Sequence, residues 1–282
     1  MSQKISLKYA EFYVTNVCNL ACDNCNRFNN MEFKGKYDFD VEQYREWAGK
    51  LDIHRLAILG GEPTYHPNLA SWIEGISTLW PKTFKMLITN GTRLNYKGLH
   101  DLLAEHKWTL EINLHKEKDS DFSKKIIHDL KKHFGPIEFV EEGCWGKDGL
   151  TYRSSKGVTI FLRNKWIFHR SAIKDYNTLE DWDSDPKLAH SLCTMKTCHH
   201  FFDGKLYKCG VAKLLPDFLK QKGKAIKSYQ KNYKPLTVEN LSQQSLDVLS
   251  NKSIDMCASC PDGTKAWESA PFETLYKKDI KI

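Results

Sequence analysis

The hydrophobic pattern of the first 140 residues alternates between short apolar runs and longer amphipathic segments. Strand-like runs occur at residues 12–17, 55–59, 84–89, 108–114 and 137–140, and apolar positions at helical spacing occur between them, at residues 41–48, 68–79, 97–106 and 122–133. Regular alternation of this kind with short loops predicts a parallel sheet with right-handed crossover connections. A sixth strand is predicted at residues 157–163.

The alternation stops near residue 190, and the remainder of the chain is rich in cysteine. Within it, Asp203-Gly204 between two apolar runs predicts a β-hairpin. We therefore expect two domains, an α/β domain over residues 1–190 and a small cysteine-rich domain over residues 191–282.

Composition indicates a folded protein, with 41% hydrophobic residues and 8 Trp among 282 residues. Neither a run of eighteen apolar residues nor a signal peptide is found, which predicts a cytoplasmic protein with no membrane partner. The net charge of +7 is unevenly spread. Residues 213–234 hold many lysines, a pattern typical of a solvated surface; nucleic-acid binding is the less favoured interpretation.

Nine cysteines form an odd set, which argues against a complete disulfide framework. Cys18, Cys22 and Cys25 follow the first strand at CxxxCxxC spacing. Three thiolates on a four-iron cluster leave one iron without a protein ligand. Structural zinc is the alternative at this site, although zinc usually takes four protein ligands and only three cysteines are present here.

A second group of cysteines lies in the C-terminal region. Cys198 and Cys209 flank the predicted hairpin, and Cys257 and Cys260 form a CxxC pair. Four thiolates in two pairs are a closed set that suits either an iron–sulfur cluster or zinc. Cys193 could replace Cys198 in this set. Cys144 is expected to be a core or loop thiol.

Other distinctive segments lie at predicted strand ends. Gly60-Gly61-Glu62-Pro63 follows the second strand, Asn90 follows the third, and Asn113 lies near the end of the fourth. The carboxyl ends of parallel strands carry the chemistry of α/β proteins. Two adjacent glycines let the backbone approach a ligand closely.

The cysteine spacing together with Gly-Gly-Glu-Pro resembles the radical S-adenosylmethionine (radical SAM) enzymes. That resemblance implies a partial (β/α)6 barrel, with a [4Fe-4S] cluster on Cys18, Cys22 and Cys25. It also implies that SAM is bound by residues at the strand ends: Gly60, Gly61, Glu62, Pro63, Asn90 and Asn113. Asn24 departs from the family, which often has an aromatic residue there, near the adenine.

The resemblance further implies reductive cleavage of SAM to a 5′-deoxyadenosyl radical, which abstracts hydrogen from a substrate. The electron would come from a donor such as flavodoxin or ferredoxin. The C-terminal cysteines resemble the twitch and SPASM extensions of the family, with a second, auxiliary [4Fe-4S] cluster on Cys198, Cys209, Cys257 and Cys260. Such a closed cluster suits electron transfer.

Three functions therefore compete. Only about a dozen residues precede the first strand, whereas peptide-modifying members usually carry an extra domain there, so a small-molecule or nucleotide-linked substrate is predicted. The alternative within the family is an enzyme that matures ribosomal peptides. The alternative from another class is a non-catalytic, zinc-bearing module that binds nucleic acid. Whether the reaction is an oxidation, a rearrangement or a crosslink is left open by the sequence.

Overall fold

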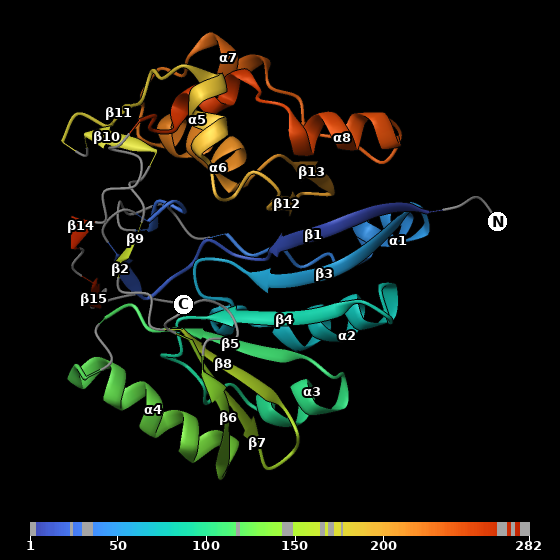
Figure 1. Cartoon of the computed structure of the whole chain (residues 1–282), viewed down its shortest axis with the longest axis vertical. Coiled ribbons are helices and arrows are strands. Elements are labelled where there is room, and N and C mark those ends of the chain that lie inside the picture. The colour runs from blue at the N-terminus through green and yellow to red at the C-terminus, as the bar shows by residue number, and fades with distance from the viewer. Residues whose placement is uncertain are drawn as a thin grey trace.

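A large sheet runs through the centre of the molecule (Figure 1). The computed structural model describes residues 4–22, 25–29, 36–116, 119–142, 149–163, 167–168, 172–175, 177–263, 270–271 and 274–276. Nine of the described strands form this sheet: β1 (Ile5–Tyr13), β3 (Leu51–Leu59), β4 (Phe84–Thr89), β5 (Thr109–Asn113), β6 (Ile137–Glu142), β7 (Gly149–Ser154), β8 (Thr159–Arg163), β12 (His199–Phe202) and β13 (Lys205–Tyr207).

The centre of the sheet is parallel. Its strand order is β13-β12-β1-β3-β4-β5-β8-β7-β6, and each neighbouring pair from β12 to β8 runs parallel. This confirms the predicted α/β class and gives the six parallel strands that a partial (β/α)6 barrel would have. Among the described strands, β13 and β6 form the two edges, so hydrogen bonding does not close the sheet into a full barrel.

Two strands differ from their predicted places. The run at 137–140 is not the fifth parallel strand: β6 lies at the edge and pairs antiparallel with β7, which pairs antiparallel with β8. A short turn at Gly157, where φ is +79°, joins β7 to β8; without an intervening helix the chain can only return antiparallel. The sixth parallel strand is β12, from beyond residue 190, which pairs with β1.

The predicted helices are confirmed to within a few residues. They are η2 (Glu42–Tyr44), α1 (Arg45–Lys50), α2 (Leu69–Leu79), α3 (Leu99–Glu105) and α4 (Asp121–Phe134), and a short turn η3 (Pro63–Tyr65) follows β3. The Ser120 hydroxyl caps α4 by accepting from the Ser123 amide at 3.2 Å, and Gly135, with φ of +71°, ends it.

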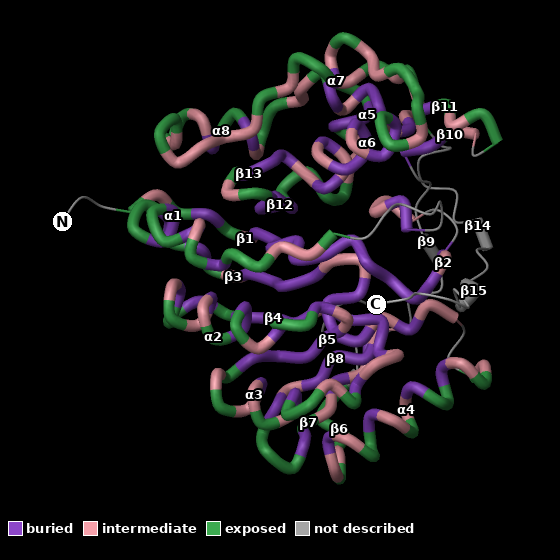
Figure 2. Tube along the Cα trace, turned by 180° about the vertical axis from the view of Figure 1, so that it is seen from behind, coloured by how far each residue is buried: buried purple, intermediate pink, exposed green. Residues whose placement is uncertain are grey.

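The core lies between the sheet and these helices, and Figure 2 shows the buried residues concentrated in the strands. Phe12 is fully buried at its centre, with ring centroids of Phe201, Tyr44 and Trp80 at 4.7, 5.0 and 5.5 Å. Because strand side chains alternate, Glu11 and Tyr13 point to the opposite face of the sheet. That opposite face carries the polar groups described below.

The C-terminal helices gather beside β12 and β13 (Figure 1). They are α5 (Pro186–Leu192), α6 (Gly210–Gln221), α7 (Ser228–Asn232), α8 (Gln243–Asn251) and the short turn η4 (Asp255–Ser259). Short strands complete the described elements: β2 (Leu20–Cys22), β9 (Ile167–Phe168), β10 (Ile173–Asp175), β11 (Glu180–Asp181), β14 (Ala270–Pro271) and β15 (Thr274–Tyr276).

The hairpin predicted at Asp203-Gly204 is present, with φ of +46° and +71° at its two turn residues. Because its first strand pairs with β1, the predicted boundary near residue 190 separates segments that share one sheet. No helix in the described part of the chain is long and apolar enough to cross a membrane.

His199 on β12 is expected to make the fold sensitive to acid. Burial holds the pKa of this side chain at about 4, below the ordinary 6.5. Nδ1 lies 2.9 Å from the Lys208 carbonyl and Nε2 lies 2.9 Å from the Ser250 hydroxyl. Between pH 6.5 and 4 the unfolded chain takes up the proton more readily, so stability falls as pH drops, by roughly 3 kcal/mol at the acid end.

His199→Asn keeps a donor for the Lys208 carbonyl but does not titrate. Urea unfolding at pH 7 and at pH 4.5 should show a smaller acid-induced loss in this variant than in the parent. An equal loss in both proteins would assign the acid sensitivity to other groups.

Candidate functional site

The three thiols of the predicted cluster site lie just beyond the end of β1. Cys18 and Cys22 are buried, Cys25 is half-buried, and the first two pack with Leu20. Burial is the main cause that raises the pKa of Cys18, and the charges of Glu62, Cys22 and Cys25 add to it. The thiols are therefore close enough to feel one another's charge. A thiophilic metal would relieve this repulsion by binding them as thiolates.

The loop that carries these thiols is anchored on both sides. Cys22 ends β2, which pairs antiparallel with β15. After the third thiol, the Phe28 amide donates to the Cys25 carbonyl at 2.9 Å, and the Phe28 ring stacks on Phe218 of α6 with centroids 5.0 Å apart. Phe28 is therefore a packing residue. Asn24 lies outside the described residues.

Gly60 and Gly61 lie against the backbone that leads into the cysteine loop. The Gly61 amide donates to the Thr15 carbonyl at 2.7 Å, and the next amide donates to the Val17 carbonyl at 2.8 Å. A Cβ on Gly60 would lie 2.4 Å from the Thr15 carbonyl oxygen, and one on Gly61 would lie 2.5 Å from that of Val17 and 2.9 Å from Cys18 Cβ. Both positions therefore require glycine.

Glu62 braces the neighbouring strand ends. Its Oε1 accepts from the Thr64 amide at 3.1 Å and from the Thr64 and Thr89 hydroxyls at 2.6 Å each, and Oε2 accepts from the Asn90 amide at 2.7 Å. Burial raises the pKa of this carboxyl, and these hydrogen bonds oppose the rise. Pro63, the first residue of η3, is buried beside it. Glu62 thus connects the ends of β3 and β4.

The two predicted asparagines lie on the same edge of the sheet. Asn90 Nδ2 lies 3.1 Å from Asn19 Oδ1 and 3.9 Å from Cys18 Sγ, so it touches the cysteine loop. Asn113 ends β5, and its Oδ1 is buried without a hydrogen-bond partner among the described residues. A buried acceptor without a partner is costly unless a ligand donates to it. This atom and the three thiols therefore suit a cluster with SAM beside it.

Further polar groups lie on this side of the sheet. His115 Nδ1 lies 3.7 Å from Cys22 Sγ. Arg163 at the end of β8 forms a 3.0 Å ion pair with Glu111, which is only 3% exposed. The sequence could have indicated Glu111, because a charged residue within an apolar strand is unusual. Its partner Arg163 could not be found in that way, because their contact depends on the pairing of β5 with β8.

Several thiols of the C-terminal region also lie close together. Burial is the main cause that raises the pKa of Cys260, and three more thiols add to it: Cys209, Cys193 and Cys257. In addition, α5 ends directly before Cys193 and packs against η4, which contains Cys257. The structure thus brings Cys193 together with three of the four predicted auxiliary ligands. Cys144 lies outside the described residues.

Cys198 also lies near Glu11 and His200; burial raises its pKa first, the charge of Glu11 adds to this, and the charge of Cys209 contributes less. Ligand atoms of Glu11, Cys198 and His200 all lie within 4.8 Å of one another and are buried. However, Arg27 Nη2 lies 3.1 Å from Glu11 Oε2, and His200 Nε2 lies 2.7 Å from the same oxygen. The guanidinium already neutralises the carboxylate, so Glu11 belongs to an ion-pair network that Cys198 adjoins.

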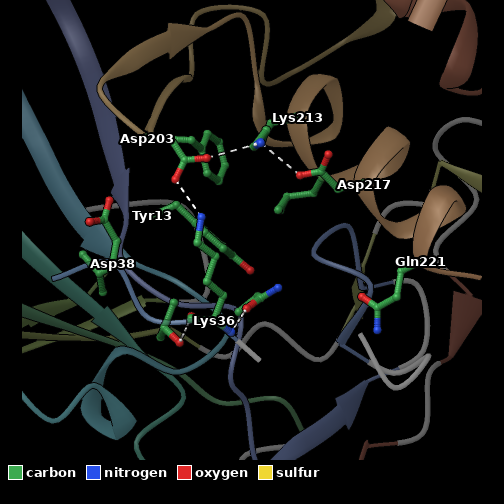
Figure 3. A pocket seen from close by; sticks show the side chains of 12 residues that line it. Tyr13, Lys36, Asp38, Asp203, Lys213, Asp217 and Gln221 are labelled. Carbon is green, nitrogen blue, oxygen red and sulfur yellow. Dashed lines mark hydrogen bonds and ion pairs between the residues drawn. The ribbon is translucent and has the colours of Figure 1, made fainter. Parts of the chain in front are cut away.

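A cavity of about 260 Å³ opens at the carboxyl ends of β1 and β12 (Figure 3). Charged side chains line one side in a chain of ion pairs: Lys36 to Asp203 at 2.9 Å, Asp203 to Lys213 at 3.3 Å, and Lys213 to Asp217 at 3.0 Å. Tyr13, Val14, Phe202 and Leu214 supply the apolar lining. The cavity therefore combines apolar walls with both signs of charge.

The lysine-rich segment is mainly a solvated surface, as the sequence favoured. Lys213 and Lys227 form ion pairs with aspartates. Four other lysines of the segment are exposed: Lys220, Lys224, Lys231 and Lys234. Exposure of this kind requires no nucleic-acid partner.

Comparison with protein families agrees with this geometry. Residues 12–141, which include the cysteine loop and the glycine pair, match the radical SAM superfamily. The chain contains a radical SAM domain. The family implies a four-iron cluster and SAM as cofactors, and the thiols and strand ends described above fit both. A search of curated proteins finds no match to the chain.

The solved structures that match the chain are distant from it. SuiB of Streptococcus suis bound to S-adenosylmethionine is 20% identical, with a TM-score of 0.35; the match covers 42% of this chain and 27% of SuiB. BtrN in complex with AdoMet and 2-DOIA is 14% identical, with a TM-score of 0.42, over 91% of this chain and 86% of BtrN. At these scores the family assignment rests on the sequence match.

Substituting Gly61 should push the backbone at positions 60–61 away from the cysteine loop. Gly61→Ala places a methyl group against Val17 and Cys18, which should cost about 1–3 kcal/mol of unfolding free energy and reduce the iron bound after anaerobic reconstitution. Urea unfolding and iron analysis measure the two effects.

The control is Gly49→Ala. Gly49 lies in α1, and a Cβ there would have no atom within 4 Å. This variant should keep its iron and be as stable as the parent or more so, because alanine favours helix. Equal behaviour of the two variants would show that the close approach at Gly61 is unimportant.

Proposed function

We propose that this protein is a radical SAM enzyme that cleaves S-adenosylmethionine reductively and removes a hydrogen atom from a small-molecule or nucleotide-linked substrate. When bound, the cluster supplies the electron for this cleavage, received from a donor such as flavodoxin or ferredoxin. One observation carries the proposal: Cys18, Cys22 and Cys25 converge at the strand ends, supported by Gly60 and Gly61, within a radical SAM domain.

The residues around the cluster site would mainly position the cofactors. Cys18, Cys22 and Cys25 would bind iron and leave one iron open. Asn113 would accept a hydrogen bond from SAM through its unpartnered Oδ1. Asn90 touches the cysteine loop and would orient it.

Around these cofactor contacts, the strand-end backbone gives support. Gly60 and Gly61 would hold the loop close to the strand ends, and Pro63 starts the turn that follows them. Glu62 has both oxygens occupied by protein donors, so it would act by keeping the strand ends together and not by exchanging protons.

The cavity at the ends of β1 and β12 is our candidate for part of the substrate site. Tyr13 lines it. Burial raises the pKa of its phenol, the charge of Arg27 opposes this, and the charges of Cys25 and Cys18 add smaller increases, so Tyr13 lies near the first thiol group. A volume of about 260 Å³ suits a metabolite better than a peptide segment. Lys213 and Lys36 could bind an anionic group by exchanging their aspartate partners.

We further propose an auxiliary iron–sulfur site on Cys193, Cys209, Cys257 and Cys260. The mutual effect of these thiols on the pKa of Cys260, after that of burial, supports this set. The set with Cys198 in place of Cys193 is the alternative, and the contact of Cys198 with Glu11 and His200 weighs against it. Four thiolates leave no iron open, which suits electron transfer.

Iron and product analysis test the proposed function. Anaerobically reconstituted protein should bind about eight iron atoms per chain if both sites hold four-iron clusters. With a reductant it should release 5′-deoxyadenosine from SAM. Cys18→Ala should abolish this release, whereas Cys257→Ala should retain part of it without coupling to substrate. Zinc at both sites and no cleavage of SAM would refute the proposal.

A second experiment distinguishes the two candidate auxiliary sets. In a background with Cys18, Cys22 and Cys25 changed to Ala, only the second site can bind iron. Adding Cys193→Ala should remove most of that iron, whereas adding Cys198→Ala should leave it. If Cys198→Ala removed most of the iron and Cys193→Ala left it, the set with Cys198 would be the correct one.

A further inference from the structure

Asp38 is a half-buried residue in the wall of the cavity at the ends of β1 and β12. The segment around it pairs with the chain that leaves β1. Thr15 bridges antiparallel to Tyr37, and the Asp38 amide donates to the Val14 carbonyl at 2.9 Å. Because side chains alternate along an extended chain, Lys36 and Asp38 share one face of this segment, and both line the cavity. The pairing therefore fixes the Asp38 carboxylate in the cavity wall.

The charges around this cavity do not balance. Of the described charged residues, two lysines and three aspartates line it: Lys36, Lys213, Asp38, Asp203 and Asp217. The two lysines are already paired, because Lys36 binds one oxygen of Asp203 and Lys213 binds the other. Lys213 also binds Asp217. Within the described part of the chain, no lysine, arginine or histidine forms an ion pair with Asp38, so its charge is left over.

Neutral groups hold the Asp38 carboxylate instead. Gln43 Nε2 lies 3.1 and 3.0 Å from its two oxygens, and the Asp40 amide donates to Oδ1 at 3.1 Å. Gln43 also touches the hairpin turn, since its Oε1 would lie 3.2 Å from a Cβ on Gly204. Asp38 and the turn that carries Asp203 thus lie against one side chain. A half-buried carboxylate without a counter-charge is costly, and a cationic ligand would offset that cost.

A second polar group in the wall lacks a partner. Tyr13 is only 6% exposed, and no described residue meets its hydroxyl at hydrogen-bond geometry. Its ring packs on Phe202, with centroids 4.9 Å apart, and Figure 3 shows the side chain extending into the cavity. Buried hydroxyl groups are normally hydrogen-bonded. A ligand in the cavity would supply the missing partner.

We propose that the cavity binds the primary ammonium group of an amine-bearing metabolite, with Asp38 as its counter-charge and the Tyr13 hydroxyl as an acceptor. This inference rests on the proposed function and names the substrate class for it. The ammonium would bring the cations level with the three carboxylates. Val14, Phe202 and Leu214 would cover the apolar part of the same molecule. Because Tyr13 ends β1 and the cysteine loop follows it, the amine would lie on the side of the sheet where the radical forms.

Binding of simple probes tests this inference without turnover. Anaerobically reconstituted protein, with SAM present and no reductant, is titrated with three probes of similar size: para-fluorobenzylamine, para-fluorobenzyl alcohol and para-fluorobenzoate. Fluorine NMR follows binding, and SAM keeps the amine out of the SAM site. The amine should bind about tenfold more tightly than the alcohol, because it alone can form an ion pair with a partly buried carboxylate. Equal affinities, or tighter binding of the benzoate, would overturn the proposal.

Variants assign the preference to particular side chains. Asp38→Asn removes the charge but keeps an acceptor for Gln43, and should lower the affinity for the amine to that for the alcohol. Tyr13→Phe should weaken binding of the amine about threefold, the value of one hydrogen bond. Asp40→Asn is the matched control, because Asp40 is exposed and does not line the cavity; it should bind the amine like the parent.

Each outcome of the variant series decides a point. An Asp40→Asn effect as large as that of Asp38→Asn would assign the preference to general surface charge and overturn the role of Asp38. Urea unfolding of each variant shows whether it is folded. If Asp38→Asn is unfolded, the comparison of amine with alcohol in the parent still decides whether the cavity binds a cation.

The same titration on the protein as purified separates this inference from the proposed function. If the protein cleaves no SAM but still prefers the amine, the proposed function fails and the amine site stands as a binding site alone. If SAM is cleaved to 5′-deoxyadenosine but amine and alcohol bind equally, only the inferred substrate class is overturned.

Discussion

The contact between two loops at the ends of β1 and β3 is the constraint on which the candidate site depends. The strands pair in register up to Tyr13 and Leu59, and the amides of Gly61 and Glu62 continue this pairing into the loop that leads to Cys18. The approach is too close for any Cβ at positions 60 and 61. The cysteine loop is thus an extension of the sheet, which explains how a segment with little regular structure can hold three thiols together.

The two faces of the sheet carry different kinds of side chain. Phe12 and its aromatic neighbours bury one face under the helices, and this apolar contact supplies most of the stabilisation. The other face holds charged side chains that are costly to bury, among them Glu11 and Glu111, each compensated by an arginine. A fold keeps such groups where function requires them. Their concentration on the face that opens toward the cysteines agrees with a reaction centre there.

The sequence predicted local features better than long-range pairing. Periodicity located α2, α3 and α4 because an amphipathic helix depends on residues a few positions apart. It could not assign β6 to an antiparallel edge or β12 to the parallel part of the sheet beside β1, because those places depend on partners far along the chain. The same limit applies to the sites. Cysteine spacing identified the first thiol group, but Cys193 and Cys198 are five residues apart, and only the fold separates their surroundings.

The pairing of β12 with β1 has a consequence for both cysteine groups. Because these strands are parallel neighbours, the loop after β1 and the hairpin turn at Asp203-Gly204 emerge at the same edge, whereas Cys198 and Cys209 lie at the base of the hairpin. Arg27 follows Cys25 by two residues, pairs with Glu11, and lies so close to Gly210 that a Cβ there would overlap it. A half-buried guanidinium therefore connects the loop of the first group to the start of α6 beside the second. Glycine at position 210 leaves room for the guanidinium. The pairing of β12 with β1 and the ion pair of Arg27 with Glu11 thus help to hold the two thiol groups in position relative to each other.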